Sequence, residues 1–167
     1  DAFDHGPWPQ LAPAERIAAF RRMVEILKTR VPELAAAWTA QMGGLASFAG
    51  PMHGGSVATL GSIADYAEAF QFVEKRATTG AAVGLVVHEP VGVVAAIAPW
   101  NGPFGIMANK VAYALLTGCT VIMKPSPETP LEAYIIAEAA EAAGIPAGVV
   151  NLVCGHREAS DHLVNNP

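Results

Sequence analysis

The feature that most limits the possible folds is an alternation of strand-like and helical segments after residue 90. Three short apolar runs, each strand-length, are separated by longer stretches with helical spacing, at 91–98, 103–117, 120–124, 129–143, 149–153 and 158–164. Connections of that length hold crossover helices, so consecutive strands should lie parallel. We therefore predict an α/β fold with a partial Rossmann-like, doubly wound parallel sheet and flanking helices.

The preceding residues predict an amino-terminal helical segment. Apolar side chains recur every three or four positions along residues 17–42, and Pro32 disfavours helical geometry in the residue before it, so two helices should meet near Arg30. After the glycine and proline breaks of residues 50–55, the same spacing predicts a third helix from 57 to 79. A further strand is predicted at 82–88, directly before Glu89-Pro90.

The composition is apolar, with 52% hydrophobic and 15% charged residues. This excess indicates a buried parallel sheet, an oligomer interface or a face that meets a segment outside the chain. No uncharged apolar run reaches ~18 residues, so we expect no membrane partner. The net charge of −5 and the absence of a Lys/Arg cluster argue against nucleic acid.

The start of the chain and its two cysteines bear on the expected cellular location. The chain begins at Asp1 without a charged-then-apolar leader, so we expect no signal peptide and a true beginning further upstream. Cys119 and Cys154 form no disulfide framework, and the five histidines lack metal-ligand spacing, so we expect no metal. Both thiols are interpreted as buried and structural. A reducing, cytoplasmic location is the expectation.

Polar residues follow the three predicted strands of the parallel sheet. In such sheets ligands bind at the carboxyl ends of the strands, which meet at one edge. Asn101 follows the first strand, and its amide either donates into the crevice, as an oxyanion stabiliser does, or caps the next helix. Lys124 ends the second strand and either contacts a cofactor or extends into solvent along its aliphatic stem. Ser126 is read from position alone as a turn residue.

Two further patterns bear on this edge. The glycine-rich dinucleotide fingerprint is absent, so a nucleotide site does not follow from spacing alone. Thr129 and Glu132 have the spacing of a capping box, which predicts that they begin the helix that ends at Gly144.

The residues themselves carry a resemblance. The run EPVGVVAAIAPWNGPFGIMANKVAYALLTGCTVIMKPSPETP, from Glu89 to Pro130, closely resembles the aldehyde dehydrogenase superfamily, above all in its PWN and KPS triplets. The stretches AFDHGPWPQLAPAERIAAFRRMVEILKTRVPELA and AEAAGIPAGVVNLVCG are similar to the same family's first helices and third core strand. The likeness covers essentially the whole chain and identifies it as an amino-terminal portion of such a protein.

The resemblance implies roles for particular positions. Asn101 would be the oxyanion-hole amide, and Lys110 the lysine of the proton network near the site. Ile97, Ala98, Pro99 and Trp100, at the end of the first strand, would line the path of the cofactor, NAD or NADP. Its adenosine ribose would bind at the ends of the next two strands, through Lys124, with Ser126, Pro127 and Gly155 beside it. The resemblance further implies a division into a helical segment, 1–80, packed on the first part of an NAD(P)-binding domain, 81–167.

The reaction that the resemblance implies is oxidation of an aldehyde to a carboxylic acid. A cysteine thiolate attacks the carbonyl, hydride passes to NAD(P)⁺, and a glutamate activates the water that releases the thioester. A homo-oligomer, dimer or tetramer, is expected for the full-length protein.

The sequence departs from the family pattern at three points. Pro127 replaces the glutamate that binds the ribose hydroxyls in NAD-preferring members, with Glu128 one place later, which leaves the coenzyme preference open. Gly102 replaces a common aromatic residue and should widen the substrate side. No segment resembles the catalytic cysteine or glutamate motifs, and the chain ends where the family continues into the pyrophosphate loop, so we expect these 167 residues alone to be inactive.

Two other functions compete with this one. A non-catalytic binding or assembly module would keep the fold without turnover. A complete short-chain oxidoreductase is poorly supported, because its glycine fingerprint and its Tyr-x-x-x-Lys pair are both absent.

Overall fold

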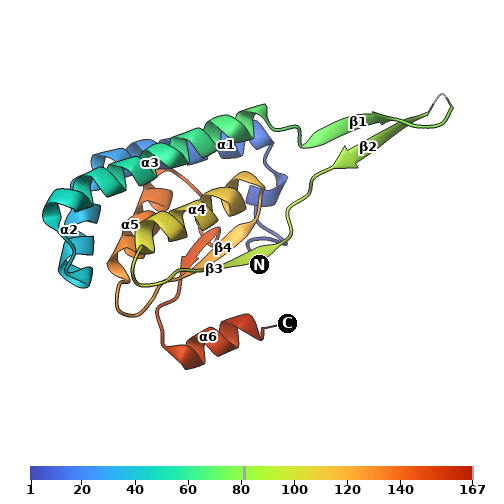
Figure 1. Cartoon of the computed structure of the whole chain (residues 1–167). Coiled ribbons are helices and arrows are strands. Elements are labelled where there is room, and N and C mark those ends of the chain that lie inside the picture. Colours follow the sequence, from blue (N-terminus) through green and yellow to red (C-terminus); the bar gives the residue numbers. More distant parts are fainter. Residues whose placement is uncertain (81, 167) are drawn as a thin grey trace.

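The computed structural model describes residues 1–80 and 82–166 and shows helices packed on a small parallel sheet (Figure 1). Ala81, where we expected the second segment to begin, and Pro167 lie outside the described residues. The elements are η1 Trp8–Gln10, α1 Pro13–Thr29, α2 Val31–Met42, α3 Ala46–Ala69, β1 Val73–Ala77, β2 Val83–Val87, β3 Val93–Ile97, α4 Pro103–Leu116, β4 Thr120–Lys124, α5 Leu131–Ala142, β5 Val150–Leu152 and α6 Arg157–Val164.

The predicted parallel sheet is confirmed. Its strand order is β3-β4-β5, both pairs are parallel, and α4 and α5 make the two crossovers. One detail of the prediction is wrong, because β3 is not covered on both faces. It is an edge strand in this chain, and Val93 and Ile97 are 59% and 38% exposed.

The junction between the first two helices also agrees with the sequence. Arg30 leaves helical geometry (φ −97°, ψ 6°), and Pro32 is the second residue of α2, where its missing N–H costs no hydrogen bond. Gly43 ends α2 with φ 71°, a left-handed conformation that glycine adopts without strain.

The third helix was predicted incorrectly at both ends. It begins at Ala46 and runs through Pro51 and the Gly54-Gly55 pair, because it buries an apolar stripe that includes Val57 and Leu60, and this burial outweighs the poor helix propensity of those residues. It stops at Ala69, and residues 73–77 form a strand instead of continuing the helix. Antiparallel pairing with β2 satisfies the backbone of β1, which helical spacing in the sequence could not reveal.

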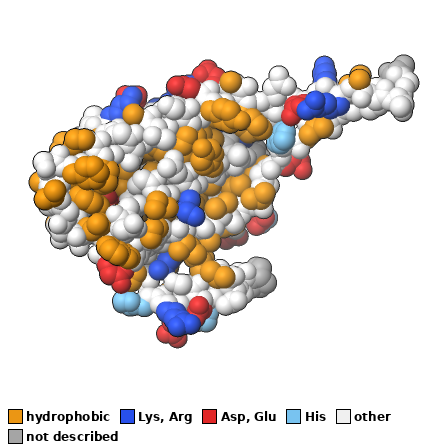
Figure 2. All heavy atoms as spheres, in the orientation of Figure 1, with side chains coloured by type: hydrophobic (Ala, Val, Ile, Leu, Met, Phe, Trp, Pro, Cys, Tyr) orange, Lys and Arg blue, Asp and Glu red, His pale blue; other side chains and the backbone are white. Residues whose placement is uncertain are grey.

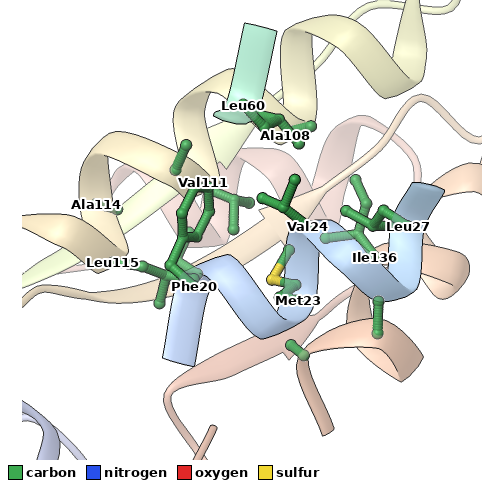
Figure 3. Packing of buried hydrophobic residues seen from close by; sticks show 14 of the residues in the cluster. Phe20, Met23, Val24, Leu27, Leu60, Ala108, Val111, Ala114, Leu115 and Ile136 are labelled. Carbon is green, nitrogen blue, oxygen red and sulfur yellow. The ribbon is translucent and has the colours of Figure 1, made fainter. Parts of the chain in front are cut away.

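One hydrophobic core joins the helices before and after residue 80. Phe20, Met23, Val24 and Leu27 of α1 point toward α4 and α5, where they meet Val111, Leu115 and Ile136 (Figure 3). Each of these side chains is 2% exposed or less. Burial of one such side chain contributes about 1.5–3 kcal/mol, so this interface fixes α1 against the sheet-bearing part of the chain.

The β1–β2 hairpin projects away from this body (Figure 1). Directly paired residues share a face, and one face carries Val73, Val83, Leu85 and Val87, all more than half exposed, together with Ala77 and with Lys75 opposite Leu85. The opposite face carries Glu74 and Arg76 with Val86. Charged and apolar side chains both appear on the arm in Figure 2.

Within residues 1–80 and 82–166, no helix combines the length and the apolar character needed to cross a membrane.

Candidate active site

The sheet register brings the three polar segments to one edge, as the parallel topology predicts. Ile97 of β3 lies beside Lys124 of β4, and the N–H of Ala98 donates to the Lys124 carbonyl at 3.2 Å. On the other side of β4, the N–H of Val153 donates to the Met123 carbonyl at 2.9 Å. The loops that follow all three strands therefore lie at the same edge of the sheet.

Asn101 lies in the loop between β3 and α4 and is exposed. The cap residue of α4 is Gly102, and no side chain caps the helix, so the capping alternative for Asn101 is excluded. The Asn101 carbonyl accepts a hydrogen bond from Nε1 of Trp38 at 3.4 Å. The side-chain amide of Asn101 therefore does not cap α4.

The other residues around this loop differ in exposure. Ala98 is buried, whereas Ile97, Pro99 and Trp100 are exposed along the edge. Lys110 is exposed on α4, about 10 Å along the helix axis from its first residue. The structure brings Ile97 and Ala98 beside Lys124, with Pro99 and Trp100 following in the loop. No hydrogen bond among the described residues joins Lys110 to Asn101.

The loop after β4 gathers opposite charges. Lys124 is only 7% exposed, so it does not extend freely into solvent. The Ser126 hydroxyl donates to the Glu128 carboxylate. This hydrogen bond, with a backbone N–H and the nearby charges of His156 and Lys124, lowers the pKa of Glu128. A hydroxyl, a carboxylate and an ammonium therefore stand together, with the half-buried Pro127 between two of them.

The segment after β5 completes the edge. Gly155 packs so closely on the first turn of α6 that a Cβ there would lie 2.6 Å from the Cβ of Ala159. Cys154 was predicted to be a buried structural thiol, and that prediction is wrong: it is exposed, with its Sγ 3.7 Å from the Tyr134 hydroxyl. The short strand β5 ends at Leu152, so Cys154 lies in the loop beyond the sheet. Only Cys119 is buried, as expected.

A match to a family model decides the relationship. The model of the aldehyde dehydrogenase family matches residues 1–167. The chain belongs to the aldehyde dehydrogenase family. An aminoacetaldehyde dehydrogenase of Pseudomonas aeruginosa is 40% identical over 169 residues, which cover 99% of this chain and 34% of that protein.

Two other members of the family extend the comparison. An NADP/NAD-dependent aldehyde dehydrogenase of Escherichia coli is 36% identical, over 92% of this chain and 31% of its own length. The crystal structure of a Mycobacterium tuberculosis aldehyde dehydrogenase complexed with NAD⁺ superposes with a TM-score of 0.94 at 38% identity, over 99% of this chain and 34% of that one. The chain thus spans about a third of the length of the family members that it matches.

Sequence reasoning missed a buried ionic pair beside this edge. Nε2 of His53 on α3 lies 2.7 Å from Oε1 of Glu132 on α5, and both side chains are 1% exposed. The predicted capping box is therefore wrong. Glu132 bonds to His53, Thr129 donates instead to the Trp100 carbonyl at 3.2 Å, and Pro130 occupies the cap position.

The only sequence signal for this pair is that His53 falls among the apolar residues of α3. Such a histidine has many explanations when the sequence is read alone, so it does not predict the contact with Glu132. Among the described residues, no three His, Cys, Asp or Glu side chains gather closely enough to hold a metal ion.

Proposed function

We propose that the protein carrying this chain is an NAD(P)⁺-dependent aldehyde dehydrogenase, and that the chain supplies its oxyanion donor and the ribose end of its cofactor site. The observation that carries the proposal is the β3–β4 register, which sets Ile97 beside Lys124. That register directs the Asn101 loop and the Lys124–Glu128 loop into one crevice. A carbonyl-polarising amide and a ribose-binding cluster are the two functions that hydride transfer needs there.

Asn101 is proposed to donate its side-chain N–H to the substrate oxygen. Negative charge grows on that oxygen when a nucleophile adds to the aldehyde carbon, so a donor already in place stabilises the transition state more than the ground state. The exclusion of a capping role for Asn101 supports this assignment. The nucleophile and the water-activating base are proposed to come from the part of the protein beyond this chain.

The cluster of Lys124, Ser126 and Glu128 is proposed to bind the adenosine ribose. When bound, NAD(P)⁺ supplies the hydride acceptor, and the chain's share is to hold it. A carboxylate accepts hydrogen bonds from ribose hydroxyls, and the lowered pKa keeps Glu128 ionised near neutral pH. Gly155 allows close approach at the same edge, and Pro127 holds the turn that presents its neighbours.

Glu128 leads us to propose a preference for NAD⁺ over NADP⁺. A carboxylate beside the ribose repels a 2′-phosphate, although it stands one position later than the family's usual glutamate. Titration of the full-length protein with each coenzyme tests this. Glu128→Ala should weaken NAD⁺ binding and narrow the gap to NADP⁺, whereas equal affinities in the unaltered protein would contradict the preference.

The remaining assignments follow from position. Ile97, Ala98, Pro99 and Trp100 are proposed to line the path of the cofactor, with the buried Ala98 contributing backbone. Lys110 is proposed to take part in proton transfer from its exposed site on α4. Residues 1–80 are proposed to be a helical segment packed on a cofactor-binding domain that begins near residue 81.

We also propose a homo-oligomer in a reducing, cytoplasmic setting. The exposed apolar face of the hairpin supports association, because water contact with four large aliphatic side chains is unfavourable. The free thiols of Cys119 and Cys154 support a reducing environment.

The experiment that tests the activity is NAD(P)⁺ reduction by the purified full-length protein with a panel of aldehydes. Aldehyde-dependent NAD(P)H formation is expected, and the 167-residue chain alone should show none. A full-length protein that binds neither coenzyme and reduces none would support the non-catalytic assembly module instead.

A further inference from the structure

Two side chains from distant parts of the sequence hold consecutive carbonyls of the Asn101 loop. Nε1 of Trp38, on α2, donates to the Asn101 carbonyl at 3.4 Å. The hydroxyl of Thr129, just before α5, donates to the Trp100 carbonyl at 3.2 Å. Both donors are themselves buried, at 6% and 1% exposed. The peptide groups on both sides of the Asn101 Cα are therefore tied to the body of the protein.

The buried His53–Glu132 pair lies directly behind these two donors. The His53 ring packs edge-on against Trp38, with ring centroids 6.3 Å apart, and also contacts Phe104 at 5.6 Å. Glu132 follows Thr129 by three residues at the start of α5. Nδ1 of His53 is bonded to the Ala49 carbonyl at 2.7 Å, so both ring nitrogens are fixed. The pair thus links α3 to the residues that hold the loop.

Space around Trp38 makes such bracing necessary. A cavity of about 180 Å³, bordered by Trp38, His53, Gly102 and Glu132, lies beside the indole. On the other side, Gly44 approaches the ring so closely that a Cβ there would lie 2.0 Å from it. The ring fits in its observed position because Gly44 has no side chain, and His53 packs against it edge-on.

A buried ion pair is a poor source of stability, because removing two charged groups from water offsets most of their attraction. One oxygen of Glu132, Oε2, has no hydrogen-bond partner among the described residues, which adds to that cost. A geometric role beside the loop therefore accounts for this pair better than a contribution to stability does.

We infer that Trp38 and Thr129, braced by the buried His53–Glu132 pair, are positioning residues that set the direction of the Asn101 amide. The inference rests on the proposed function, because it takes Asn101 as the oxyanion donor. Fixing these two successive carbonyls fixes the peptide planes on both sides of the Asn101 Cα and so constrains the direction of the Asn101 Cα–Cβ bond. An oxyanion donor is effective only when its orientation is set before the reaction, and small misplacements reduce the rate strongly.

The test uses the full-length protein with Thr129→Val and Trp38→Phe, which remove one hydrogen-bond donor each and keep most of the packing. Each should lower kcat about tenfold, on the scale of a modest misplacement, without changing the affinity for NAD⁺. Thr129→Ser, which keeps the hydroxyl, should restore kcat. The matched controls are Thr120→Val and Trp8→Phe, at buried sites away from the loop, and both should leave kcat unchanged.

A double-mutant cycle separates positioning from a general structural role. If Thr129 acts through Asn101, then Thr129→Val should lower kcat no further in a protein that already carries Asn101→Ala. Additive losses in that cycle, or unchanged kcat in both Thr129→Val and Trp38→Phe, would overturn the inference while leaving the proposed function intact. A wild-type protein without aldehyde-dependent NAD(P)⁺ reduction would overturn the proposed function and, with it, the inference.

Discussion

The helical interior and the β1–β2 hairpin use the same kinds of side chain under opposite conditions. In the interior, Phe20 and Leu115 are completely buried against neighbouring helices of the same chain. On the hairpin, Val83 and Leu85 are 65% and 60% exposed. The backbone is regularly hydrogen-bonded in both regions. The two differ in whether other residues of this chain cover the apolar side chains.

This difference indicates where each region obtains its stability. The interior is stabilised by contacts within the chain, which act at any protein concentration. The apolar face of the hairpin is stabilised only when another surface covers it, so its contribution should depend on assembly. Substitutions in the interior should therefore lower the stability of the fold, whereas substitutions on the apolar face of the hairpin should change the assembly.

The largest loss of stability is expected in the interior. Phe20→Ala removes a ring of α1 that packs beside Val111 and Leu115 of α4 (Figure 3), and should destabilise the protein by about 3–5 kcal/mol, with the cavity term included. Thermal or denaturant unfolding of the full-length protein measures it, and the loss should not depend on protein concentration. A loss below about 1 kcal/mol would mean that this core does not hold α1 in place.

A charge on the apolar face of the hairpin should act on assembly instead. Val87→Lys places an ammonium opposite Val73, within the exposed aliphatic cluster, and should shift the full-length protein toward smaller species in light scattering after size exclusion. Val86→Lys, on the opposite face beside Glu74, is the matched control and should leave the assembly unchanged. Equal behaviour of the two variants would remove the distinction between the faces.

The smallest expected effect is on the pH dependence of stability. It should differ between two histidine–carboxylate pairs, the buried His53–Glu132 and the exposed His88–Glu74 of the hairpin. Burial opposes a charge on His53, but hydrogen bonds to Glu132 and Ala49 and the nearby carboxylate charge outweigh it, so the pKa of His53 is raised above 6.5. A raised folded-state pKa means that the stabilisation is complete below the unfolded value and is lost as pH rises through the folded value.

The difference in melting temperature between the wild-type protein and His53→Gln should therefore be largest below the ordinary histidine pKa of about 6.5 and shrink as the pH rises above it. His88→Gln should follow the wild-type profile across the same range, because exposed pairs contribute little to stability. A difference for His53→Gln that widens as pH rises would contradict the stated sign.

The sheet was predictable from the sequence because its signals are local. Short apolar strands, a helix-ending Gly118 and the positions of Asn101 and Lys124 after two strands follow from order along the chain, and parallel topology then places both residues at one edge. The start of α3 was not predictable in this way. Tertiary packing overrides the local preference of Pro51 and its neighbouring glycines, and no local pattern reports that packing.

The surroundings of the candidate site were less predictable than its members. Thr129 and Glu132 match a capping box in sequence. In the structure, however, Glu132 hydrogen-bonds to His53, 79 residues away, and the Thr129 hydroxyl donates to the Trp100 carbonyl. Likewise, cysteines are usually buried, but Cys154 is exposed, because β5 ends at Leu152 and leaves Cys154 in the loop beyond the sheet. Contacts between elements decide such cases.

Asn101 is proposed to donate to the oxyanion, and removal of its amide tests that role most directly. In the full-length protein, Asn101→Ala should lower kcat by about two to three orders of magnitude, the scale for losing one oxyanion donor. The control is Asn151→Ala, because that amide bonds to the Gly148 carbonyl at the opposite end of the sheet, and its kcat should be unchanged. If Asn101→Ala turns over at the wild-type rate, Asn101 is not the oxyanion donor and the account of this crevice fails.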